Sequence, residues 1–249
     1  MIDLHCHILP GVDDGPAAVE ESLAMARRAT EDGIHTIVAT PHTLNGIYVN
    51  PVDEVIARVS DLEKHLLKDR IQLKLYAGAD VHLCPHMLEL IEKGEAVTIN
   101  NGMKYLLLEF PSQTIPRGVE DEVFSLKLNG ITPIITHPER NTVIQHDLNI
   151  LQEFVRIGAM SQIVGMSITG DFGGAAQACA ERLLVHRLAH VIASDAHSGE
   201  RRPPVLSRAV EAAAEIMGSY EDAERMVTEI PSAILSGDVP ELPEPKRGR

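Results

Sequence analysis

The chain has 249 residues, of which 44% are hydrophobic and 23% charged, so its composition excludes wholesale disorder. Its 22 basic and 36 acidic residues give a net charge of −14, which disfavours nucleic-acid binding because a phosphate backbone would be repelled. The three cysteines are widely spaced and predict no disulfide framework. No stretch approaches the roughly 18 apolar residues of a membrane span, and no signal peptide is recognisable. We therefore expect a cytoplasmic protein without membrane insertion.

Seven short apolar runs, separated by segments with helical periodicity, follow one another along the chain. They cover residues 1–7, 36–42, 73–81, 105–110, 132–137, 159–164 and 190–197. Each run is continuous rather than alternating, which is typical of parallel strands buried on both faces. Between the runs, apolar residues at helical spacing predict helices over 19–26, 52–66 and 148–155. Gly33, Gly130 and Gly158 follow helical segments, where a positive φ is favoured.

Seven strand–helix units in a row indicate either an open doubly wound sheet or a barrel. We expect one domain over residues 1–237, followed by a flexible, charged and proline-rich tail over residues 238–249. The sequence leaves the oligomeric state open, a homo-oligomer included.

Six of the seven apolar runs end in histidine, aspartate or glutamate. His5 and His7 stand two residues apart, so both side chains point to the same side of the first strand. The other runs end in His42, Asp80, Glu109, His137, Asp195 and His197, and Asp13 and Asp14 follow shortly after the first run. In a parallel barrel these ends meet on one face, where catalytic groups gather.

Four carboxylates and five imidazoles buried together would be costly unless cations neutralised them. Nitrogen and oxygen donors without a thiolate suit Zn, Mn or Fe, and nine donors are enough for two or three ions. Polynuclear sites of this kind hydrolyse phosphoryl and acyl groups. A single strand-end Asp or His is more often a cap or a satisfied polar residue, but coincidence at six strand ends is a poor explanation. We assign such structural roles to the histidines at 35, 65, 82, 86, 146, 186 and 190.

The pattern resembles the PHP (polymerase and histidinol phosphatase) metallohydrolase superfamily. The matching segments are D-L-H-C-H (3–7), D-D-G-P (13–16), T-P-H (40–42), G-A-D (78–80), L-E-F (108–110), I-T-H-P-E-R (135–140), I-A-S-D-A-H (192–197) and R-P-P (202–204). Within the superfamily the chain is most similar to the bacterial manganese-dependent protein tyrosine phosphatases encoded with capsule and exopolysaccharide genes. The resemblance implies an α/β fold, a distorted (β/α)7 TIM-like barrel with parallel strands and outer helices.

Carried over position by position, the resemblance implies two or three divalent metal ions, Mn first, with Fe, Co and Zn also suited to the ligands. The related phosphatases usually have glutamate at the bridging position. Asp80 is one methylene shorter, so the third metal is the one that the sequence leaves open. The implied ligands are His5, His7, Asp195 and the bridging Asp80 for the first metal, Asp14, His42 and His197 for the second, and Asp80, Glu109 and His137 for the third.

The resemblance also implies that Arg140 and Arg202 bind phosphate, since a guanidinium pairs bidentately with phosphate oxygens. The implied reaction is hydrolysis of phosphotyrosine by in-line attack of a metal-bridging hydroxide. Ile47 and Tyr48, in the loop after His42, are candidates to flank the substrate ring, and packing of that loop on its own helix explains them equally well. The implied partner is a bacterial tyrosine autokinase with a tyrosine-rich tail that controls polysaccharide export.

Three alternatives stay open. Histidinol phosphate phosphatase shares the metal set, but a pocket for a small cationic imidazole would need more acidic groups at its rim. A nuclease is disfavoured by the acidic balance and by the lack of basic patches. A non-catalytic metal-binding regulator of the kinase would have no need for both a full ligand set and the two arginines.

Overall fold

The structure is a computed structural model that describes residues 1–246, and its nine strands form two parallel sheets. In the three-stranded sheet the order is β1 (Ile2–Cys6), β2 (Thr36–Ala39) and β4 (Lys74–Ala77). In the six-stranded sheet it is β3 (His42–Thr43), β5 (Asp80–His82), β6 (Tyr105–Glu109), β7 (Thr132–Thr136), β8 (Met160–Val164) and β9 (Val191–Ala193). Every pair of neighbours is parallel, so the predicted α/β class is confirmed.

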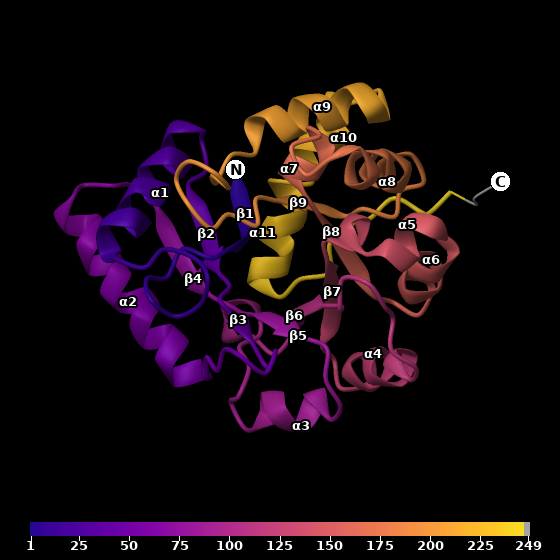
Figure 1. Cartoon of the computed structure of the whole chain (residues 1–249), viewed down its shortest axis with the longest axis horizontal. Helices are drawn as coiled ribbons and strands as arrows, with labels where there is room; N and C mark the ends of the chain where they lie inside the picture. Colours follow the sequence, from indigo (N-terminus) through magenta and orange to yellow (C-terminus); the bar gives the residue numbers. More distant parts are fainter. Residues whose placement is uncertain (247–249) are drawn as a thin grey trace.

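Helices surround the strands on all sides of the view in Figure 1. Helices α1 and α2 flank the three-stranded sheet, whereas α4, α5, α6 and α8 lie beyond β7 and β8. The bounds are α1 Val19–Glu31, α2 Val52–Lys68, α3 Met87–Glu92, α4 Val119–Leu128, α5 Thr142–His146, α6 Asn149–Arg156, α7 Gly165–Ile168, α8 Gly174–Val185, α9 Ser207–Met217, α10 Tyr220–Arg225 and α11 Glu229–Ser236, with short 3-10 helices η1 Ile99–Asn101 and η2 Pro138–Arg140.

The amphipathic patterns of the sequence correspond to the buried faces of these helices. Helix α2 buries Val55, Val59, Leu62 and Leu66 against the sheet, at the spacing that predicted it. Gly33, Gly130 and Gly158 have φ values of 86°, 80° and 99°, so the predicted left-handed positions are confirmed. No helix within residues 1–246 combines the length and apolar character needed to cross a membrane.

The second and third apolar runs each form two strands because the chain bends within them. Pro41 separates β2 from β3, and proline has no backbone N–H to continue a ladder. Gly78 separates β4 from β5, and a Cβ there would lie 2.7 Å from Cγ1 of Val38, so the close approach requires glycine. Each bend takes its segment from the three-stranded sheet into the six-stranded sheet.

A closed barrel, which the resemblance implied, is not what the described strands form. No ladder joins the edge strands β1 and β9 among the described residues; β1 forms one isolated bridge, between Cys6 and Ala196 in the segment after β9. Beside it, Asp195 N–H donates to the His5 carbonyl and His7 N–H donates to the Ala196 carbonyl, both at 2.8 Å. The bends at Pro41 and Gly78 interrupt the ladder on the opposite side, and two sheets result.

The predicted tail is described only as far as residue 246; residues 247–249 lie outside the described range. Residues 238–246 form no helix or strand, but they contact the body of the molecule. The Tyr105 hydroxyl donates to the Asp238 carbonyl at 2.6 Å, and Lys246 N–H donates to the His186 carbonyl at 2.9 Å. The division into a domain and a flexible tail stays a prediction.

One buried histidine, at the amino end of β9 and away from the predicted ligands, makes the stability of the fold depend on pH. Burial lowers the pKa of His190 to about 4, and its Nδ1 accepts a hydrogen bond from Ser161 N–H at 3.0 Å. The folded protein therefore keeps this ring neutral, whereas the unfolded chain protonates it near pH 6.5. The contribution is complete above that pH and is lost as the pH falls towards about 4.

We expect the free energy of unfolding in EDTA to fall with decreasing pH. The protonation of His190 should contribute at most about 1.4 kcal/mol per pH unit to this slope. His190→Gln keeps an acceptor for Ser161 but does not titrate, so its slope between pH 6.5 and pH 4 should be shallower. Urea unfolding at several pH values measures the slopes, with His65→Gln on the exposed face of α2 as the matched control. Equal slopes for the His190 variant and the wild type would contradict this assignment.

Candidate metal centre

The carboxyl ends of the parallel strands bring the predicted ligands together on one face. His5 and His7 lie at the end of β1, His42 on β3, Asp80 on β5, Glu109 at the end of β6, His137 after β7, and Asp195 and His197 after β9. Three groups of these side chains place ligand atoms within 4.8 Å of one another. The groups are His7, Asp14, His42 and His197; His5, His7 and Asp80; and His42, Asp80 and Glu109.

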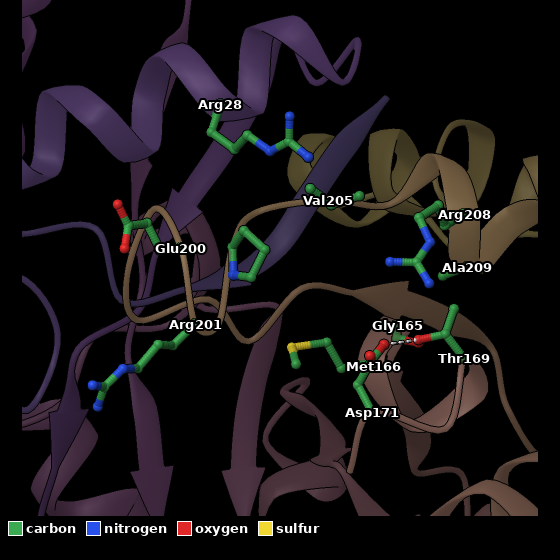
Figure 2. Close-up of a pocket in the computed structure, with 11 residues that line it drawn as sticks. Arg28, Gly165, Met166, Thr169, Asp171, Glu200, Arg201, Val205, Arg208 and Ala209 are labelled. Atoms are coloured by element: carbon green, nitrogen blue, oxygen red, sulfur yellow. Dashed lines mark hydrogen bonds between the residues drawn. The ribbon is translucent and has the colours of Figure 1, made fainter.

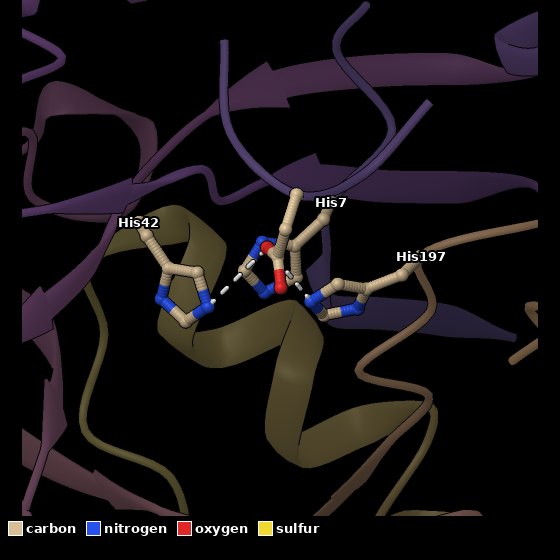
Figure 3. Close-up of side chains that lie close together, drawn as sticks. His7, His42 and His197 are labelled. Carbon is tan, nitrogen blue, oxygen red and sulfur yellow. Dashed lines mark ion pairs between the residues drawn. The ribbon is translucent and has the colours of Figure 1, made fainter. Parts of the chain in front are cut away.

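The first group draws on the loop after β1 as well as on the strands. Figure 3 shows His7, His42 and His197 converging from different parts of the chain. Oδ1 of Asp14 lies 3.3 Å from Nε2 of His197 and 3.7 Å from Nε2 of His42. The Asp14 side chain is half exposed, whereas that of His7 is fully buried. This group therefore lies at the solvent side of the centre.

The second group lies deeper. Nε2 of His5 is 3.1 Å from Nε2 of His7 and 3.6 Å from Oδ2 of Asp80. Oδ1 of Asp195 lies 3.4 Å from Nε2 of both histidines. The side chains of His5, His7 and Asp80 have no exposed surface. The protein around this group would separate a cation bound here from solvent.

The third group shares members with the other two. Asp80 Oδ2 is 3.3 Å from Nδ1 of His42, which in turn is 3.7 Å from Oε2 of Glu109. His137 lies beside this group, with its Nε2 3.7 Å from Oε1 of Glu109, although it belongs to none of the three. Asp80 thus faces both the second and the third group, as a bridging carboxylate requires.

Outer hydrogen bonds orient three of the histidines towards the centre. Nδ1 of His5 lies 2.8 Å from Oε1 of Gln162, Nδ1 of His7 lies 2.7 Å from Oδ2 of Asp13, and Nδ1 of His197 lies 2.9 Å from the Asp195 carbonyl. Because an acceptor at Nδ1 keeps the proton there, each neutral ring presents the lone pair of Nε2 to the centre. Lone pairs of His5 and His7 that face each other at 3.1 Å need a cation or a proton between them.

The charges at the centre shift several pKa values. Burial alone would lower the pKa of His7, but Asp13 and Asp195 raise it to about 10. Burial and the neighbouring charge of His7 lower the pKa of His197 to about 2. The pKa of Asp195 lies well below its usual value although burial opposes this, because His5, His7 and Arg202 favour its anion. One proton on His7 therefore takes the place of a cation in the metal-free protein.

Two of the predicted ligands have strained backbone. His137 has φ 35° and Asp195 has φ 51°, both in the left-handed region that side chains with a Cβ rarely adopt. Such conformations cost about 1–3 kcal/mol each and are retained where the surrounding structure requires them. His137 directly follows β7 and Asp195 lies two residues after β9, and the turn at each directs the side chain towards the centre.

The two predicted arginines meet at Asp195. Oδ2 of Asp195 accepts from NH1 of Arg140 at 2.8 Å and from NH2 of Arg202 at 2.6 Å. The Arg140 and Arg202 guanidinium groups also lie over the ring of Phe172, at 4.7 and 5.5 Å from its centroid. Phe172, in the loop before α8, carries no sequence signal of this role, and its place became clear only from the structure.

The sequence did not identify His82 and Glu139 as residues of this site. Nδ1 of His82 lies 3.2 Å from Oε2 of Glu109, beside the third group. Glu139 is fully buried and accepts hydrogen bonds from Val164 N–H and the Ser167 hydroxyl, which fixes the turn that carries Arg140. Burial raises the pKa of Glu139 to about 7.

The loop after His42 forms one wall of the centre. The ring of Tyr48 lies parallel to that of His42, with centroids 6.3 Å apart and an interplanar angle of 10°. Ile47 is 78% exposed, so its side chain faces solvent. The loop therefore places one aromatic side chain, that of Tyr48, beside a member of the first group.

A family model for capsular polysaccharide synthesis, CpsB/CapC, matches residues 1–236. The chain belongs to the CpsB/CapC family. Tyrosine-protein phosphatase YwqE of Bacillus subtilis (strain 168) is 40% identical over 202 residues, which are 81% of this chain and 79% of that protein. Tyrosine-protein phosphatase CpsB of Streptococcus pneumoniae is 31% identical over 235 residues, which are 91% of this chain and 95% of that protein.

A crystal structure from work on YwqE and CpsB, described as unique metal-dependent tyrosine phosphatases, matches this CpsB/CapC-family chain with a TM-score of 0.95. The two chains are 36% identical, and the match covers 100% of both. The predicted resemblance to metal-dependent tyrosine phosphatases of capsule loci is confirmed.

The protonation of His7 makes metal binding sensitive to pH. At pH 7 a pKa of about 10 keeps a proton on His7 in the metal-free protein, and this proton must leave before Nε2 binds a cation. We therefore expect Mn²⁺ binding at pH 7 to release protons, measured by titration calorimetry in buffers of different ionisation enthalpy. Asp13→Asn removes a carboxylate that raises the pKa of His7, so it should release fewer protons.

Asp61→Asn, at an exposed position of α2, is the control for this experiment. It should release as many protons as the wild type. A binding enthalpy that is the same in every buffer for the wild type would contradict the proposed protonation of His7.

Proposed function

We propose that this CpsB/CapC-family protein is a divalent-metal-dependent phosphatase that hydrolyses phosphotyrosine in proteins. The observation that carries the proposal is the polar face at the strand ends, where buried imidazoles and carboxylates meet two arginines. The match to metal-dependent tyrosine phosphatases over 100% of the chain supports it.

The donor set fits metal ions. Nδ1 of His42 and Oδ2 of Asp80 are buried, lie 3.3 Å apart and have no hydrogen-bond partner among the described residues, as expected of atoms that a cation would bind. Their nitrogen and oxygen chemistry suits Mn first, and Fe, Co and Zn also fit. In this proposal His5, His7, Asp80 and Asp195 hold one ion, Asp14, His42 and His197 a second, and Asp80, Glu109 and His137 a third.

When bound, the cations supply an activated water and neutralise charge on the phosphoryl oxygens. The arginines do the complementary work. Arg140 and Arg202 reach the centre from outside the ligand groups, and their N–H groups donate to phosphate oxygens when these displace Asp195 Oδ2 as acceptor. The Nε of Arg202 is buried without a hydrogen-bond partner, so this guanidinium has a further donor. Tyrosinate, whose parent pKa is about 10, leaves with little acid assistance.

Phe172 holds the two guanidinium groups in place. Its ring gives both a common surface, at 4.7 Å from Arg140 and 5.5 Å from Arg202. Cation–π contacts of this kind contribute about 0.5–2 kcal/mol each, depending on exposure. Phe172 is thus a positioning residue, which keeps both arginines aimed at the same phosphate.

The same proposal includes the substrate and its setting. Ile47 and Tyr48 flank the phenyl ring of the substrate, which the position of the Tyr48 ring beside His42 and the exposure of Ile47 support. The substrate protein is a bacterial tyrosine kinase tail, and the reaction takes place in the cytoplasm, with the protein alone or as a homo-oligomer. Residues 1–237 act as one unit, in which the two sheets serve as a distorted seven-unit barrel.

We expect the protein to hydrolyse a phosphotyrosine peptide with Mn²⁺, to lose this activity in EDTA, and to prefer the peptide over histidinol phosphate in kcat/KM. His7→Ala and Asp195→Ala should abolish activity and lower the bound metal, because each removes a donor to a buried cation. Arg140→Ala should lower kcat about a hundredfold with metal content unchanged. Retained activity in His7→Ala, or a preference for histidinol phosphate, would overturn the assignment of ligand or substrate.

Phe172→Leu keeps an apolar side chain, although a smaller one, and removes the ring beneath both guanidinium groups. We expect kcat to fall about three- to tenfold with unchanged metal content, and Phe172→Tyr to restore most of it. The exposed Phe124→Leu on α4 is the matched control. If Phe172→Leu raised only KM, the ring would contact the substrate and would not position the arginines.

A further inference from the structure

A second polar cavity lies on the other side of the loop that carries Arg202. It has a volume of about 170 Å³ and is lined by residues of α1, α7, α9 and the loop before α9. Figure 2 shows Arg28 of α1 and Arg208 of α9 extending into it from opposite sides of Val205. The cavity is built from residues that none of the three ligand groups uses.

These two arginines are poorly neutralised. Arg28 has only Glu31 nearby, at 3.8 Å between half-exposed side chains, which is a weak pair. Within residues 1–246, Arg208 has no carboxylate within 4.0 Å. Two guanidinium groups that face one cavity repel each other unless an anion lies between them. This local positive charge lies in a chain whose net charge is −14.

The position of Arg208 adds to the positive potential. It lies in the first turn of α9, which holds no acidic residue. The positive end of a helix dipole lies there and disfavours a cation. Asp32 accepts hydrogen bonds from Leu206 N–H at 2.6 Å and Ser207 N–H at 3.0 Å. Its carboxylate therefore caps the amino end of α9 and does not pair with Arg208.

The acidic residues that line the cavity do not satisfy the pair. Oδ2 of Asp171 accepts a hydrogen bond from the Thr169 hydroxyl at 2.5 Å. Figure 2 shows Glu200 and Arg201 directed away from the space between Arg28 and Arg208. The cavity therefore offers a ligand two guanidinium groups, a weakly paired Arg28 and an Arg208 without a carboxylate within 4.0 Å among residues 1–246.

The cavity adjoins the proposed phosphate-binding arginines through the chain itself. Pro203 lines the cavity, and its neighbour Arg202 bonds to Asp195 in the metal centre. Asp171 lines it as well, and its neighbour Phe172 lies beneath both guanidinium groups of the centre. A polypeptide with its phosphotyrosine at the metal centre thus has a cationic subsite within a few residues' reach.

We propose that Arg28 and Arg208 form a subsite for a second anionic group, a carboxylate or a phosphate, on the polypeptide that presents the phosphotyrosine. This inference rests on the proposed function, since it assigns the sequence preference of the same phosphatase. It selects substrates in which the phosphotyrosine has an acidic or phosphorylated neighbour. A guanidinium pair binds phosphate or carboxylate oxygens by charge-assisted hydrogen bonds.

The test uses three peptides that are identical except at one position flanking the tyrosine, which is glutamate, phosphoserine or glutamine. Each carries a non-hydrolysable phosphonate in place of the tyrosine phosphate, so fluorescence anisotropy measures binding to the Mn²⁺-loaded protein independently of turnover. We expect the wild type to bind the glutamate peptide about tenfold more tightly than the glutamine peptide at low salt, and the phosphoserine peptide more tightly still. Added salt should reduce these ratios.

Arg28→Gln/Arg208→Gln should bring all three peptides to the affinity of the glutamine peptide. The matched control is Arg58→Gln/Arg156→Gln, which removes two surface arginines paired with Glu54 and Glu153, and it should keep the preference. Equal affinities in the wild type, or a loss shared by the control, would overturn the subsite. The preference between glutamate and phosphoserine identifies the anion.

Hydrolysis of para-nitrophenyl phosphate, which has no second anion, separates the two proposals. For this substrate, the kcat/KM of Arg28→Gln/Arg208→Gln should stay within about twofold of the wild-type value. An inactive wild type that still prefers the glutamate peptide would refute the phosphatase and support the subsite. An active wild type without the preference would do the reverse.

Discussion

The structure depends on the balance of buried charge at the carboxyl ends of its strands. Imidazoles and carboxylates meet there at 3.1–3.7 Å, and the deepest of them, His5, His7 and Asp80, have no exposed side-chain surface. Without a cation, protons and the two arginines must compensate, and they do so through Asp195, whose two oxygens face the histidines on one side and the guanidinium groups on the other. Asp195 therefore joins the part of the centre that would bind metal to the part that would bind phosphate.

The ligand positions could be predicted from the sequence because parallel strands impose them. In such an arrangement every strand ends on the same face, so an apolar run that stops at His, Asp or Glu places that residue without any knowledge of the helices. The glycines after helices were predictable for a similarly local reason, the need for a positive φ. The closed barrel was not, because closure depends on hydrogen bonds between the first and last strands, which local patterns do not determine.

Asp14 was predicted as a ligand, but the roles of Asp13, Gln162 and Phe172 were not, because they depend on the path of loops and on contacts between segments. Asp13 and Asp14 are neighbours of the same type, yet Asp13 orients His7 and Asp14 faces His42 and His197. Which one faces the centre depends on the path of the loop. Phe172 and Gln162 have no distinguishing neighbours in the sequence. The role of Gln162 depends on the contact of β8 with His5, and that of Phe172 depends on how the loop before α8 meets Arg140.

The seam between the first and last strands has a thermodynamic consequence. Few backbone bonds hold β1 to the segment after β9, yet His5 and His7 lie on one side of this seam and Asp195 and His197 on the other. An ion bound by both sides would join the first strand to the segment after the last strand. Its binding free energy would then be linked to unfolding by mass action, so the apparent melting temperature would follow the free metal concentration. The metal would thus determine the stability of the protein as well as its chemistry.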